Sequence, residues 1–147
     1  MQQSKHTNII LLRGACLWLL MALLLAWCMV AINFNVPPFK LIFAGEFKRL
    51  LQAHIDFLLM TALILSIYAA KVQLPWHVSW AMVIGAFTNS SLFLLMAIFP
   101  ALDTPNLAPP FVFQLYLFTS LFITSYGFGK ASVLVLLSTF KHEKINH

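Results

Sequence analysis

Four long runs of apolar residues, separated by short polar stretches, dominate the chain. They cover about residues 9–32, 50–70, 78–101 and 111–140. Each run reaches the roughly 20 residues that an α-helix needs to cross the hydrocarbon layer of a membrane. The breaks between the runs carry prolines, which are typical of turns: Pro37-Pro38, Pro75, Pro105 and Pro109-Pro110. The pattern predicts an all-α protein, a four-transmembrane-helix bundle formed by residues 1–147 as a single domain.

The composition agrees with a membrane protein. Hydrophobic residues make up 61% of the chain and charged residues 9%, whereas charged residues make up about 25% of a typical soluble domain. The net charge of +5 is spread over tails and loops. Without a clustered basic surface it does not indicate nucleic-acid binding. The sequence contains no phosphate-binding loop, no paired-cysteine metal site and no nucleophile elbow.

The distribution of positive charges predicts the orientation in the membrane. Four spans place both termini on one side, together with the residues Lys5, Arg13, Lys71, Lys141 and Lys144. The other side holds fewer positive charges and one acidic residue: Lys40, Lys48, Arg49 and Asp103. Because positive residues concentrate in cytoplasmic loops, we expect cytoplasmic termini. We therefore expect an integral protein of a bacterial inner membrane, with the lipid bilayer as its first partner.

Three of the polar residues within the predicted spans stand out, His54, Asp56 and Asn89, because polar groups at membrane depth usually mark function. Taking the side opposite the termini as the reference, His54 lies about 6 Å deep, Asp56 about 9 Å and Asn89 about 18 Å. On a helical wheel His54 and Asp56 point about 200° apart, so they do not form a side-by-side pair. Asp56 either faces Gln52 and Arg49, anchoring the helix end, or contacts a cofactor edge or a subunit interface.

His54 allows two interpretations. A histidine in a membrane can hydrogen-bond a neighbouring helix, or ligate a metal or haem iron through a neutral imidazole nitrogen. The other histidines lie at the opposite membrane face or in the tails: His77, His6, His142 and His147. A haem on His54 would thus keep an open iron position within one subunit unless Met96 or another soft ligand filled it. An open iron suits Lewis-acid chemistry or ligand binding better than electron transfer.

Small and polar residues interrupt the third and fourth spans. In GAFTNSSLF, residues 85–93, small side chains permit close helix packing, and Asn89 either bonds across helices or lines a substrate or cofactor pocket. In YGFGK, residues 126–130, Gly127 and Gly129 stand among bulky side chains. These two glycines predict a close-packing helix face.

Two of these segments carry a family resemblance. QAHIDFLLM, residues 52–60, and GAFTNSSLFLLMAIFP, residues 85–100, resemble styrene oxide isomerase. The hydroxylaminobenzene mutases are similar in having an Ala-His pair with an acidic residue two positions later, as in Ala53-His54-Ile55-Asp56. The resemblance implies a homotrimer of four-helix subunits with haem b between them and His54 as the iron ligand. It also implies ferric iron acting as a Lewis acid on an epoxide, and Asn89, which matches the asparagine of the third span, is the catalytic candidate.

Three positions depart from the isomerase pattern. Met60 stands where the isomerase has an asparagine, Gly85 replaces its aspartate and Phe93 replaces its tyrosine. We therefore expect a drier cofactor site, with His54, Asp56, Met60 and Phe93 as the cofactor-binding candidates. The first hypothesis is a cofactor-assisted isomerisation of a small apolar compound. The alternative is a non-catalytic membrane protein, either a binder of haem or a small ligand or a structural accessory subunit.

Overall fold

The computed structural model describes residues 2–104 and 108–143, with side chains for residues 9–104 and 108–140. Four long helices make up the fold: α1 (Gln2–Asn33), α3 (Phe47–Ala69), α4 (Trp76–Ile98) and α5 (Phe111–Glu143). Two short elements join them, α2 (Pro37–Ile42) and the 3₁₀ helix η1 (Pro100–Asp103). The described residues contain no β-strand, and all four long helices are long and apolar enough to cross a membrane. The predicted all-α, four-helix fold is confirmed.

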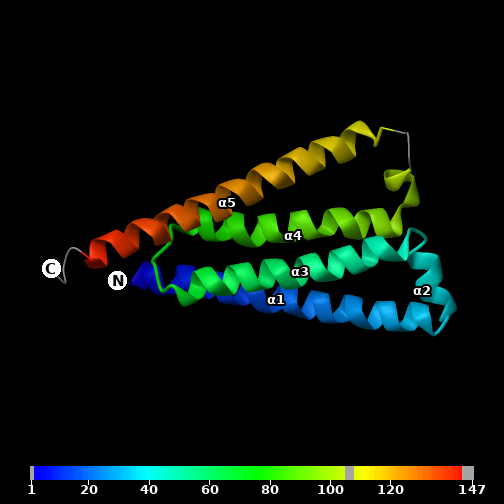
Figure 1. Ribbon diagram of the computed structural model, residues 1–147, viewed down its shortest axis with the longest axis horizontal. Helices are drawn as coiled ribbons and strands as arrows, with labels where there is room; N and C mark the ends of the chain where they lie inside the picture. The colour runs from blue at the N-terminus through cyan, green and yellow to red at the C-terminus, as the bar shows by residue number, and fades with distance from the viewer. Residues whose placement is uncertain (1, 105–107, 144–147) are drawn as a thin grey trace.

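The long helices pack in the order α1, α3, α4, α5, with a further contact between α1 and α4 (Figure 1). α1 begins and α5 ends at the same end of the bundle, which we call the terminal end. α2 and η1 lie at the opposite end, which we call the loop end. α5 lies close to α4 at the terminal end and diverges from it toward the loop end. Within the described ranges, α4 is therefore the only long helix that contacts the other three extensively.

Local backbone chemistry sets where two of the helices end. α1 is followed by Asn35 in the left-handed conformation, with φ of 59°, which asparagine tolerates better than most residues. Pro37 then begins α2, because proline fits the first turn of a helix. α4 ends at Ile98, earlier than the predicted limit of residue 101. Phe99 precedes Pro100, which disfavours helical backbone, and it adopts φ −114° and ψ 90°.

Two apolar clusters fill the interior of the bundle. The terminal-end cluster consists of Leu11, Ala15, Met60, Ile64, Leu74, Val78, Met82, Val83, Ala86 and Ala131. The loop-end cluster consists of Ala22, Leu25, Cys28, Leu50, Ala53, Phe57 and Ala97. Trp18 packs against both clusters, stacks on Phe87 with ring centroids 4.9 Å apart, and donates Nε1–H to the Val83 carbonyl at 3.1 Å. This tryptophan links α1 to the middle of α4.

Glycine allows α4 and α5 to approach closely at two positions. A Cβ atom on Gly127 would lie 2.7 Å from the backbone nitrogen of Met82, and one on Gly85 would lie 2.8 Å from Cα of Thr124. Both contacts are with backbone, which cannot move aside cheaply. A Cβ atom on Gly129 would meet nothing within 4 Å. The prediction that Gly127 and Gly129 share a close-packing face is therefore right for Gly127 and wrong for Gly129.

Candidate functional site

His54 is half-buried on α3 and bonds to the backbone of α1. Its Nδ1 atom lies 2.8 Å from the carbonyl oxygen of Ala22. A carbonyl oxygen can only accept a hydrogen bond, so Nδ1 carries the proton and donates it. The proton on Nδ1 leaves the lone pair of the neutral ring on Nε2. This is the tautomer in which histidine ligates metals through Nε2.

The Nε2 atom of His54 is open at the surface of the bundle. No hydrogen bond reaches it within the described part of the chain, where Ser79 Oγ is the only buried side-chain polar atom without a partner. Nε2 is therefore not sealed in the interior. Its neighbours along the same helix are apolar and lie 37% to 53% exposed: Leu51, Ile55 and Leu58. His54 is thus part of an exposed apolar surface of α3, which could contact lipid, a cofactor or another copy of the chain.

His54 belongs to no cluster of three or more metal-ligating side chains (His, Cys, Asp or Glu) in the described part of the chain. His77 lies in the first turn of α4 at the terminal end. The remaining histidines and several of the charges used to predict orientation lie outside the described side chains: Lys5, His6, Lys141, His142, Lys144 and His147. Pro105 lies outside the described residues too.

Asp56 bonds to α4 through one of its two carboxylate oxygens. Its Oδ2 atom accepts one hydrogen bond from Asn89 Nδ2 at 2.9 Å and another from Ser90 Oγ at 2.8 Å. The prediction that Asp56 anchors the helix end through Arg49 is wrong, because the donors come from the middle of the neighbouring helix. His54 and Asp56 thus bond different helices, as their opposite positions on the helical wheel indicate.

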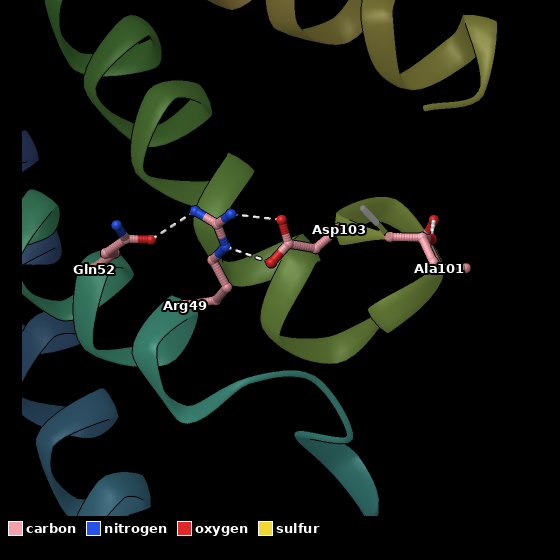
Figure 2. A network of polar contacts seen from close by, with 5 residues as sticks. Arg49, Gln52, Ala101 and Asp103 are labelled. Atoms are coloured by element: carbon pink, nitrogen blue, oxygen red, sulfur yellow. Dashed lines mark hydrogen bonds and ion pairs between the residues drawn. The ribbon is translucent and has the colours of Figure 1, made fainter. Parts of the chain in front are cut away.

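Arg49 bonds instead to the loop end of the bundle (Figure 2). It forms two parallel bonds to Asp103, Nε to Oδ2 at 2.6 Å and Nη2 to Oδ1 at 2.5 Å, and donates from Nη1 to Gln52 Oε1 at 2.9 Å. The hydrogen bonds from Arg49, and less strongly the positive charges of Arg49 and Lys48, hold the pKa of Asp103 below its ordinary value against the opposing effect of burial. This ion pair fixes η1 to α3.

Hydroxyl groups join α4 to α5 along their shared face. Ser91 Oγ donates to the Thr88 carbonyl at 2.9 Å, so the hydroxyl of Tyr116, 2.6 Å away, must donate to Ser91. Ser120 Oγ donates to Thr88 Oγ1 at 3.0 Å. Each polar group here is paired within the protein. Such bonds between membrane helices are typical of association rather than of chemistry.

The remaining sequence-predicted site residues lie in the interior. Met60 is 8% exposed within the terminal-end cluster, and Phe93 is half-buried against the loop-end cluster. The structure brings together only Asp56 and Asn89. In a single chain His54 lies apart from that pair, and Met60 and Phe93 belong to two different clusters. The five residues therefore do not line one common pocket.

An apolar cavity of about 280 Å³ lies where α5 diverges from α4, next to η1. It is lined by Leu95, Leu102, Pro110, Val112, Phe113 and Tyr116. Because the hydroxyl of Tyr116 donates to Ser91, it has no proton left to donate into the cavity. The space is suited to an apolar group and is separate from the α1–α3 interface that holds His54.

Three contacts of the site were not predicted from the sequence. The carbonyl of Ala22 leaves no trace in a side-chain pattern, because every residue has one. The partner of Arg49 could have been found: the predicted topology already placed Arg49 and Asp103 on the same side of the membrane. Ser90 follows Asn89 in the GAFTNSSLF segment, and both side chains donate to Asp56.

The chain matches no family model, no curated protein and no solved structure.

Proposed function

We propose that this protein binds haem b within the membrane and that Nε2 of His54 would hold its iron. The observation that carries the proposal is the 2.8 Å bond from His54 Nδ1 to the Ala22 carbonyl. Metal-ligating histidines almost always donate their other ring N–H to a carbonyl or carboxylate, which fixes the tautomer and the ring orientation. His54 has this partner, its second nitrogen has no hydrogen bond among the described residues, and its exposed neighbours on α3 are apolar.

The proposal includes a homo-oligomer. Leu51, Ile55 and Leu58 beside His54 are 37% to 53% exposed, so one chain offers an apolar surface but no enclosure. A porphyrin has two large apolar faces, and the face away from one chain needs cover as well. A second copy of the same surface would supply it, and the resemblance to the isomerase suggests a trimer.

The reaction that fits these residues is the isomerisation of a small apolar compound carrying one oxygen group. Ferric haem, when bound, supplies a Lewis acid for such an oxygen. Asn89 donates one of its two amide protons to Asp56 and has a second N–H and a carbonyl oxygen with which to orient a substrate. His54 bonds to α1, whereas Asn89 bonds to Asp56 on the opposite side of α3, so we expect the two residues to reach one substrate only across neighbouring copies.

A cofactor-free packing role is the competing candidate. It is favoured by the fact that His54 and Asp56 already bond to neighbouring helices, α1 and α4 respectively. In that case both residues, together with Asn89, serve helix association. Under this alternative the open Nε2 atom would contact lipid and have no ligand.

Absorption spectroscopy separates the two functions. The full chain, produced with adequate haem supply and purified in detergent, is expected to show a Soret band that His54→Ala abolishes. The matched control is His77→Ala, which removes an imidazole at the other membrane face and should leave the band intact. A colourless wild-type protein, or a band that survives His54→Ala, would exclude the proposed ligand.

A further inference from the structure

A cluster of cationic and aromatic side chains lies at the terminal end, between the start of α4 and α5. The ammonium nitrogen of Lys130 lies 3.4 Å from His77 Nε2, 3.3 Å from the Tyr126 hydroxyl and 5.4 Å from the centre of the Tyr126 ring. The rings of His77 and Tyr126 stack 6.3 Å apart, and Trp76 packs edge-on against His77. We call these four residues, Trp76, His77, Tyr126 and Lys130, the interfacial cluster.

No described carboxylate neutralises Lys130. The only ion pair among the described side chains, Arg49 with Asp103, lies at the loop end. Glu46 lies at the loop end as well, since it immediately precedes α3. Asp56 bonds to the middle of α4. The interfacial cluster therefore presents a positive charge without a protein counter-ion in the described part of the chain.

The position of Lys130 along α5 places it at the boundary of the membrane. It lies 19 residues after Phe111, the first residue of the helix, which corresponds to about 28 Å of helix and nearly matches the roughly 30 Å of hydrocarbon in a bilayer. Lys130 also contacts His77 in the first turn of α4, so the cluster lies at the end of that span. At this level lipid headgroups are the nearest source of a counter-ion.

We propose that the interfacial cluster binds the headgroup phosphate of an anionic phospholipid. The Lys130 ammonium has three N–H donors, and its two protein contacts, at 3.3 and 3.4 Å, leave a donor for phosphate oxygens. Trp76, 67% exposed, and Tyr126 provide the aromatic surface that membrane proteins place at headgroup level. Basic sites beside transmembrane helices bind anionic headgroups in this way. The proposal is independent of haem binding.

Lipid retention tests the proposal. The full chain is reconstituted in mixed phosphatidylcholine and phosphatidylglycerol vesicles, extracted gently and examined by native mass spectrometry. Phosphatidylglycerol is expected to be retained in preference to phosphatidylcholine. Lys130→Gln should weaken that preference about fivefold, the contribution of one basic residue near an anionic surface, and Lys130→Arg should preserve it. Lys48→Gln, the same charge change on an exposed lysine at the loop end, is the matched control.

Two results would overturn the site. One is a preference for phosphatidylglycerol that is unchanged in Lys130→Gln. The other is a loss of this preference in Lys48→Gln as large as that in Lys130→Gln. Such a result would show only a general attraction between a basic protein and an anionic membrane. A second measurement is fluorescence quenching: brominated phosphatidylglycerol should quench the tryptophan fluorescence of the wild type more than brominated phosphatidylcholine does, and this excess should fall in Trp76→Phe. An excess that is absent, or that is unchanged in Trp76→Phe, would contradict the proposal.

Discussion

The two interfaces of α3 use polar residues differently. On the α1 side, His54 makes one bond to a backbone carbonyl and its other nitrogen is open. On the α4 side, Asp56 accepts two side-chain donors at one oxygen, and the hydroxyls beyond it pair with one another across α4 and α5. The polar groups on the α4 side therefore form a network typical of helix packing. On the α1 side, the single bond of His54 orients its ring as in a metal-ligating histidine. Hydrogen-bond pairing, rather than depth in the membrane, would therefore distinguish a haem ligand from a packing residue.

The largest expected effect is that of replacing His54, which should abolish haem binding but change the stability of the protein only slightly. His54→Ala should remove the Soret band completely, yet lower the free energy of unfolding by only about 0.6 kcal/mol, the average for a hydrogen bond between membrane helices. Both quantities can be measured on one preparation, by absorption and by unfolding in mixed micelles. A large loss of stability with full retention of haem would reverse the roles assigned to the two sides of α3.

The next effect concerns the packing of α4 on α5. Gly127→Ala should destabilise the protein by about 1–3 kcal/mol, the usual cost of overpacking, because the new methyl group would lie 2.7 Å from a backbone nitrogen of α4. Gly129→Ala is the matched control and should cause no loss, since nothing lies within 4 Å of its Cβ position. Equal effects in the two variants, measured by unfolding in micelles, would show that α5 packs on α4 in another register.

Asp56 should behave in the opposite way to His54. Asp56→Ala leaves Asn89 Nδ2 and Ser90 Oγ without their acceptor and should cost about 1–2 kcal/mol of stability, the sum of two bonds between membrane helices. Asp56→Asn retains one acceptor oxygen and should cost less. The Soret band of both variants should match the wild type in position and intensity. If a well-folded Asp56→Asn protein lost the Soret band, the carboxylate of Asp56 would have to be part of the cofactor site.

The fold could be predicted from the sequence because each membrane-spanning helix is encoded by its own apolar run. Apolar runs long enough to span a bilayer predicted four membrane-spanning helices, and the described residues contain four helices of that length and composition. Boundaries were less secure, as at Phe99, where the following proline ends α4 early. Such local effects involve one residue and its neighbour, so they change an element's length without changing its existence.

The site was harder to predict because it depends on pairing between helices. The wheel positions of His54 and Asp56 correctly separated the two residues. Spacing alone could not say that Asp56 meets Asn89 and Ser90 rather than Arg49, because helix rotation and depth are set by packing throughout the bundle. Met60 and Phe93 were assigned to the cofactor site by resemblance, yet both lie against apolar clusters.

The smallest expected effect is a pH dependence at the loop end, away from both interfaces. The pKa of Asp103 is lowered by its bonds to Arg49, so the native state binds its proton less readily than the unfolded chain does. The stabilisation is therefore fully present above the unfolded-state pKa of about 3.9 and is lost as pH falls through the lower native-state value. We expect a loss of about 1 kcal/mol or less, as for a partly exposed ion pair, measured as the difference between the wild type and Asp103→Asn in micelle unfolding from pH 7 to pH 2.5. If this difference stayed constant across that range, the Arg49–Asp103 pair would make no contribution to stability.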